Sequence, residues 1–170
     1  MSLDSLPGGS RLWLLALAQP PDPAGAALLA QGLEEILSHW RHKGQAYQAA
    51  GALLEPQLIA VAEPLLATRP SGCAIDGMLR KVRRLLESLG LDLVDPAASL
   101  LVRMGGRLVP IPKGDLQARL DDGTLDSRTP VLDLSLYSLQ DLRNGGLERA
   151  LAATWVARRY RLAVVVAADP

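Results

Sequence analysis

The sequence predicts a folded α+β protein. Short apolar runs that are typical of buried strands alternate with two longer segments in which apolar residues recur at helical spacing. Apolar residues make up 49% of the 170 residues and charged residues 21%, a balance that is typical of a chain with a buried core. We therefore expect strands and helices packed together, with Leu, Val, Ile and Ala filling a core that has no phenylalanine.

The first 104 residues predict six elements in the order strand, helix, strand, strand, helix, strand. Residues 12–18 form a compact apolar run that ends before Pro20-Pro21, which indicates a buried strand. A helix is expected from Pro23 to a stop at Gly44, and a second helix from the Ser71–Asp76 loop to Gly90. The remaining strands are residues 50–54 and 58–62, which flank a turn, and residues 100–104.

This order matches a ferredoxin-like βαββαβ arrangement, in which an antiparallel sheet carries both helices on one face and leaves its other face open. We expect a single domain over residues 1–170, with a core at about residues 11–110 and a C-terminal extension at about residues 111–170. Gly105-Gly106 predicts a hairpin turn. Beyond it the extension is expected to contain a short helix at 116–120, an extended segment at 129–133, a helix at 147–160 with Trp155 in its apolar stripe, and a strand or tail at 162–168.

Charge and composition exclude several classes of function. Eighteen basic and eighteen acidic side chains cancel, and aromatic residues make up only 4%, so a nucleic-acid partner is not expected. A single cysteine excludes an intramolecular disulfide, and no apolar run is long enough to span a bilayer, so we expect a cytoplasmic protein with no membrane partner. The chain has no phosphate-binding P-loop, dinucleotide fingerprint or serine nucleophile elbow.

Cys73, in the Ser71-Gly72-Cys73-Ala74-Ile75-Asp76 stretch, is the leading candidate for chemistry. At a helix N-terminus the helix dipole favours a thiolate, and His39 or His42 would then act as base with Asp76 as orienter or acid. The structural interpretation makes Cys73 a small buried residue at the loop-to-helix joint. Asp76 is then only a first-turn carboxylate that favours the helix dipole.

Two further groups of residues have a functional and a structural interpretation. His39 and His42 are three residues apart near the end of the first helix, where they could share a face, but their spacing to Cys73 matches no compact zinc motif and no metal site is predicted. A basic cluster on the second helix would bind a phosphate-rich ligand or form a solvated polar face. Its members are Arg80, Lys81, Arg83 and Arg84.

Four landmarks in the chain together resemble a family of small bacterial proteins, of Bacteroidetes type, with a Trp…His…Ser-Gly-Cys-Ser-[Ile/Thr]-Asp pattern. They are Trp40 with His42, the Ser71–Asp76 motif, residues 126–133 and Trp155. Ala74 departs from the pattern, because the family has serine there. Members are sometimes labelled "ABC transporter ATPase", but this chain has no P-loop, and the resemblance implies no particular activity.

The leading hypothesis is therefore a module that binds a small ligand or a protein where the Ser71–Asp76 loop meets Trp40 and His42. An anion held by backbone N–H groups is one candidate ligand, and no cofactor is expected. The alternatives are a thiol-dependent enzyme with Cys73 as nucleophile, and a structural or homo-oligomeric partner that uses the open face of the sheet. The expected ligand-binding residues are Ser71, Gly72, Trp40, Arg80 and Arg84; the expected catalytic residues are Cys73, His42 and Asp76.

Overall fold

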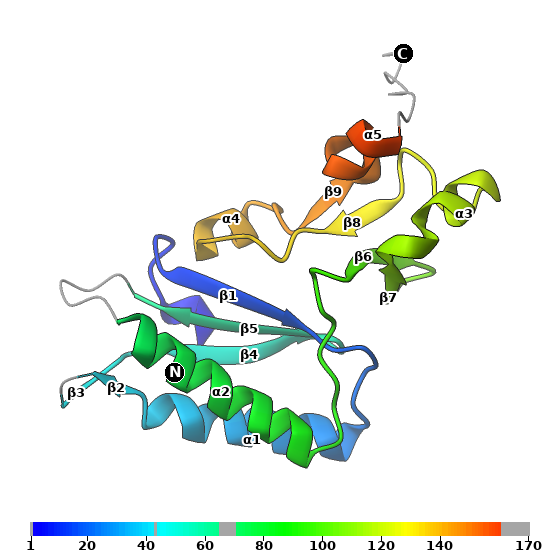
Figure 1. Cartoon of the computed structure of the whole chain (residues 1–170). Helices are drawn as coiled ribbons and strands as arrows, with labels where there is room; N and C mark the ends of the chain where they lie inside the picture. Colours follow the sequence, from blue (N-terminus) through cyan, green and yellow to red (C-terminus); the bar gives the residue numbers. More distant parts are fainter. Residues whose placement is uncertain (1, 43, 65–70, 161–170) are drawn as a thin grey trace. The chain divides into compact units, whose positions relative to one another are not determined.

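The computed structural model describes residues 2–42, 44–64 and 71–160, with only the backbone described for His42 and Gln45. These residues form an α+β structure of antiparallel sheets and five α-helices (Figure 1), which confirms the predicted fold class. The chain divides into two compact units. Unit 1 comprises Met1–Val94 and Leu134–Gly145, and unit 2 comprises Asp95–Asp133 and Gly146–Pro170.

Unit 1 is built on a three-stranded antiparallel sheet in the order β1-β5-β4. Strands β4 and β5 form the hairpin that the sequence predicts, with Ala50 opposite Ala62. Because β5 is central, all six of its residues are buried. The elements of unit 1 are the 3-10 turn η1 (Leu3–Ser5), β1 (Arg11–Ala16), α1 (Pro23–Ser38), β2 (Arg41–His42), β3 (Gln45–Ala46), β4 (Ala50–Glu55), β5 (Leu58–Glu63), α2 (Gly72–Ser88) and α4 (Leu139–Arg143).

The ferredoxin-like arrangement is not confirmed, because the segment expected to be its fourth strand lies in another sheet. Residues 100–104 belong to β6 (Ser99–Met104), which pairs with β7 (Arg107–Pro112) on one side and β8 (Pro130–Leu132) on the other. Both edges of β6 are therefore occupied. The hairpin turn is local and well formed, since Gly105 and Gly106 both adopt positive φ angles, +56° and +77°. The outer edge of β1 instead meets two single bridges, Arg11 with Ser138 and Leu17 with Leu93.

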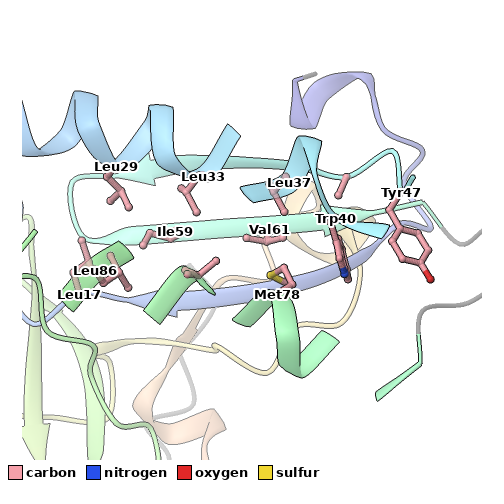
Figure 2. Close-up of a cluster of buried hydrophobic side chains, with 12 residues drawn as sticks. Leu17, Leu29, Leu33, Leu37, Trp40, Tyr47, Ile59, Val61, Met78 and Leu86 are labelled. Carbon is pink, nitrogen blue, oxygen red and sulfur yellow. The ribbon is translucent and has the colours of Figure 1, made fainter. Parts of the chain in front are cut away.

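Helices α1 and α2 cover one face of this sheet and share a single core with it (Figure 2). Each helix begins at a side-chain cap: Asp22 accepts a hydrogen bond from the Gly25 N–H, and Ser71 accepts one from the Ala74 N–H. The buried stripe of α1 comes from residues four apart, as an amphipathic helix requires. Its members Leu29, Leu33 and Leu37 pack with Met78, Val82 and Leu86 of α2 and with Ile59 and Val61 of β5.

Helix α1 ends at Ser38, so the predicted stop at Gly44 is wrong. The chain turns after Leu37 and reverses through the β2–β3 hairpin, in which the Tyr47 N–H donates to the Trp40 carbonyl. Gly44, with φ +81°, lies in the turn of this hairpin. Along the sequence, Ile36, Leu37 and Trp40 have the spacing of a helical stripe. Only Ile36 and Leu37 lie in α1; Trp40 enters the same core from beyond the end of the helix. His39 and His42 therefore do not share a helical face.

The second face of the sheet is buried along β1. Strand β1 alternates between side chains that join the helix-covered core, such as Trp13, and side chains that are buried on the opposite face. Leu12, Leu14 and Ala16 on that opposite face are 3%, 7% and 1% exposed. The part of this face that β1 forms is therefore buried, whereas Leu54 in the edge strand β4 is 38% exposed. A structural-partner function stays a prediction.

Unit 2 contains a four-stranded sheet in the order β7-β6-β8-β9. The predicted short helix is confirmed as α3 (Leu116–Asp121), and the predicted extended segment contains β8. The predicted helix at 147–160 is wrong: this region contains β9 (Glu148–Ala150), the 3-10 turn η3 (Leu151–Ala153) and α5 (Trp155–Tyr160). Residues 148–150, near the start of the predicted helix, instead form β9, which pairs with β8 in the sheet. Another 3-10 turn, η2 (Lys113–Asp115), precedes α3, and residues 162–168 lie outside the described residues.

The buried members of the unit 2 core are aliphatic, whereas the separate core of unit 1 includes Trp40 and Tyr47. Leu151 and Val156, from the segment predicted as one helix, are fully buried in it, whereas Trp155 is 38% exposed. The other members are Leu100, Val102, Ile111, Leu116, Leu125 and Val131. Within the described ranges, no helix has both the length and the apolar character that crossing a bilayer requires.

Leu33→Ala should destabilise unit 1 by about 2–5 kcal/mol, because it leaves a cavity at a fully buried position. Leu28→Ala, on the same helix but 53% exposed, should change the free energy of unfolding by less than about 0.5 kcal/mol. Urea unfolding followed by tryptophan fluorescence measures both variants. A Trp155→Phe background confines the signal to Trp13 and Trp40 of unit 1. Equal losses in the two variants would contradict the packing described.

Candidate functional site

A hollow of about 170 Å³ lies in unit 1, between the end of α1 and the first turns of α2. Its lining combines apolar and aromatic side chains with basic ones. The described lining residues are Ile36, His39, Trp40, Arg41, Ala74, Gly77, Met78 and Lys81. This is the region of Trp40 and the Ser71–Asp76 loop on which the sequence-based hypothesis is centred.

Trp40 fixes the geometry of this hollow. Its indole Nε1–H donates to the carbonyl oxygen of Ala74 at 3.0 Å, which ties the segment after α1 to the first turn of α2. The ring meets Trp13 edge-on, with centroids 5.9 Å apart, and lies 4.8 Å from the ring of Tyr47. Figure 2 shows Trp40 and Tyr47 at one end of the buried cluster. With only 5% of Trp40 exposed, this wall is held in place without a ligand.

Helical spacing determines which residues of α2 reach the hollow. Ala74, Gly77 and Lys81 are separated by three and four residues and therefore lie on one flank of the helix. At 100° per residue, Cys73 lies about 100° from Ala74 around the helix axis, on the side away from the buried stripe. Arg80 and Arg84, seven and eleven positions after Cys73, share its exposed face. The structure thus places Lys81 of the basic cluster at the hollow, and not Arg80 or Arg84.

The charged residues of the lining favour an anion. Arg41 and Lys81 are exposed cations, and no described lining residue carries a carboxylate. The Nδ1 of His39 lies 2.9 Å from the backbone carbonyl oxygen of Glu35. Nδ1 also lies 3.1 Å from the Ser38 hydroxyl oxygen, so this nitrogen contacts its own helix end and Nε2 is the second polar atom of the ring.

The backbone of the Ser71–Asp76 segment is largely committed to its own helix. The N–H groups of Ala74 and Ile75 donate to the Ser71 carbonyl oxygen at 2.9 and 3.1 Å, and Ala74 N–H also reaches the Ser71 hydroxyl. Ser71 is the N-cap, so the alanine at position 74 removes no capping group. Asp76 lies beyond the first turn, contrary to the prediction. Gly72 is exposed and lines no part of the hollow that the structure describes.

Cys73 is exposed, so the interpretation of this residue as a buried plug at the helix joint is wrong. Cys73 and Asp76 are absent from the described lining of the hollow. The side chain of His42 lies outside the described residues, so its pairing with Cys73 stays a prediction. Among the described residues, no group of three or more His, Cys, Asp or Glu side chains could hold a metal ion.

A buried ion pair that the sequence did not predict joins the first residue of β1 to the last residue of β5. Arg11 and Glu63 are cross-strand partners, and the Arg11 Nε lies 3.7 Å from an oxygen of the fully buried Glu63 carboxylate. The guanidinium carbon also lies 5.7 Å from the centroid of Trp13 and 5.8 Å from that of Tyr137. The predicted strands, 12–18 and 58–62, stop one residue short of Arg11 and Glu63. If each is extended by that residue and the two are aligned antiparallel, the two charges lie opposite one another.

Comparison with known protein families, curated proteins and solved structures found no match to this chain. The resemblance to the bacterial family with the Ser-Gly-Cys pattern therefore stays a prediction. The candidate site is argued from its own residues.

The stability of unit 1 should fall as pH rises above about 10, in part through Tyr47. Burial first, and then the negative charge of Glu63, raise the pKa of Tyr47 above its ordinary value of 10.0. The unfolded chain consequently loses this proton at lower pH than the folded chain does, which favours unfolding between the two pKa values. Urea unfolding at several pH values between about 8 and 11 measures the effect.

Tyr47→Phe should reduce this loss of stability at alkaline pH, because it removes the titrating group. Tyr137→Phe is the matched control, since Tyr137 is 58% exposed, and it should leave the alkaline loss unchanged. The same pH dependence in both variants and the parent protein would contradict the role of Tyr47.

Proposed function

We propose that this chain is a cytosolic binding module whose ligand is a small carboxylate with a short apolar chain, held in the hollow between α1 and α2. The observation that carries this proposal is the composition of the lining: two exposed cations, Arg41 and Lys81, beside the apolar side chains of Ile36, Trp40 and Met78. An amphipathic anion satisfies both parts of such a surface, whereas a neutral or cationic ligand satisfies one part at most.

The size of the hollow supports a small ligand. A volume of about 170 Å³ is below the roughly 300 Å³ at which sites for larger organic molecules begin. A short-chain carboxylate is small enough to suit this volume.

The packing of the hollow supports selectivity more than tight affinity. Trp40 is fixed by its bond to Ala74, so the apolar wall is organised before binding and little conformational entropy is lost there. Arg41 and Lys81 are exposed, and an exposed ion pair contributes only about 0–1 kcal/mol. We therefore expect dissociation constants on the order of millimolar for a ligand this small.

Titration with butyrate tests the proposal, with ¹H–¹⁵N NMR shifts of α2 and of the Trp40 indole as the readout. Butyrate should shift these signals and 1-butanol should not, because the alcohol lacks the charge. Lys81→Ala should weaken butyrate binding about threefold or more. Arg84→Ala, on the exposed face of the same helix, is the matched control and should leave binding unchanged. Equal weakening by both variants, or shifts confined to other elements, would refute the proposed site.

A thiol-dependent enzyme is the second proposal, and the exposure of Cys73 is the observation that favours it. If His42 or His39 acts as base for this thiol, His42→Ala or His39→Ala should slow alkylation of Cys73 by iodoacetamide about tenfold at neutral pH. Mass spectrometry of the native protein measures the rate, and each histidine variant serves as the control for the other. Unchanged rates in both variants would exclude activation of Cys73 by either histidine.

A further inference from the structure

A second, larger hollow has its described lining in unit 2, beside the exposed side of α5. Its volume is about 460 Å³, and its described lining residues are Lys113, Trp155, Arg159 and Tyr160. This volume falls within the range of about 300–1,000 Å³ that is typical of sites for organic ligands. None of its described lining residues lines the hollow between α1 and α2, so the two hollows can be tested separately.

Lys113 is held in place before any ligand arrives. Its ammonium group donates to the carbonyl oxygens of Pro96 at 3.1 Å and Ala97 at 2.7 Å. The same nitrogen lies 5.4 Å from the ring centroid of Trp155, within the range of a cation–π contact. These contacts fix a positive charge beside an indole ring that is still 38% exposed.

The short helix α5 places the other cation and the second ring. Val156 and Ala157 are buried and attach the helix to the core of unit 2. Trp155 and Arg159 are four residues apart and therefore lie on the same side of the helix. The guanidinium carbon of Arg159 lies 5.9 Å from the ring centroid of Tyr160. Among the described residues, two aromatic rings and two cations thus line one hollow.

The chemistry of this lining selects for a flat ring that carries an anionic group. Aromatic faces stack on planar rings, and a guanidinium group binds phosphate oxygens in pairs. No acidic residue is among the described residues that line the hollow, so the local charge is positive although the whole chain is neutral. We infer that this hollow binds a nucleotide, with its base against Trp155 and Tyr160 and its phosphate at Arg159 and Lys113.

The ligand is a free nucleotide and not a nucleic-acid strand. A strand is attracted by a field of many positive charges and loses counterions along its length. This chain has equal numbers of acidic and basic residues, and the hollow supplies two rings and two cations, enough for one nucleotide unit. The expectation that nucleic acid is not a partner is therefore compatible with this site.

Titration of the full chain with AMP tests the inference, with the NMR signal of the Trp155 indole N–H as the readout. AMP should shift that signal, while adenosine and inorganic phosphate should each bind about tenfold more weakly, because each lacks half of the recognised chemistry. Inorganic phosphate binding as tightly as AMP would overturn the role of the rings. Adenosine binding as tightly as AMP would overturn the role of the cations.

Variants of adjacent arginines separate a local site from general charge. Arg159→Gln should weaken AMP binding about tenfold, whereas Arg158→Gln, next to it and exposed but outside the described lining, should leave it unchanged. Trp155→Phe keeps a ring and should retain binding, and Trp155→Ala should lose it, with the backbone amide signals of α5 as the readout in these two variants. Equal effects of the two arginine variants would overturn the site. An eight-residue oligoadenylate binding about tenfold more tightly than AMP would overturn the assignment to a free nucleotide.

Discussion

The indole of Trp40 is the contact on which the organisation of unit 1 depends. Its N–H group donates to the Ala74 carbonyl at the start of α2, while its ring packs against Trp13 of β1 and Tyr47, which follows β3. One side chain thereby joins the end of α1, the sheet and α2. Because a buried indole N–H requires an acceptor, this bond fixes where α2 begins relative to the end of α1. The hollow between the two helices is a consequence of that spacing.

Burial of the central strand explains the rest of the architecture of unit 1. Every residue of β5 is buried, so both faces must be covered and both edges paired. The charge at its last position, Glu63, is retained because Arg11 lies opposite it in the register and is itself flanked by aromatic rings. Strand β6 pairs with β7 and β8 and so has no free edge for pairing with β1. The chain therefore has the element order of a ferredoxin-like fold without its four-stranded sheet.

The two hollows show how a chain with no net charge can still present sites of one sign. In each, cations stand beside apolar or aromatic side chains, and no carboxylate is among the described lining residues. In each, one contact organises the wall in advance: Trp40 on Ala74 in unit 1, and Lys113 on two backbone carbonyls in unit 2. In the two ligands that we propose, selectivity would come from the pairing of charge with shape, while solvent exposure limits the strength of each ion pair. The two hollows differ in volume, about 170 Å³ in unit 1 and about 460 Å³ in unit 2.

The sequence by itself determined several local elements: the β4–β5 and β6–β7 hairpins, the start of each long helix and the α+β class. These follow from the periodicity of apolar residues, from helix-capping side chains and from glycines in turns, all of which act over a few residues. Only the tertiary structure decided that Trp40 enters the core from outside α1, that β6 pairs within unit 2, and that Trp155 is exposed. It also decided that Lys81, and not Arg80 or Arg84, reaches the hollow. Those outcomes depend on which distant segments pair with a given strand edge or pack on a given helix flank. The spacing of residues along the chain does not determine these long-range contacts.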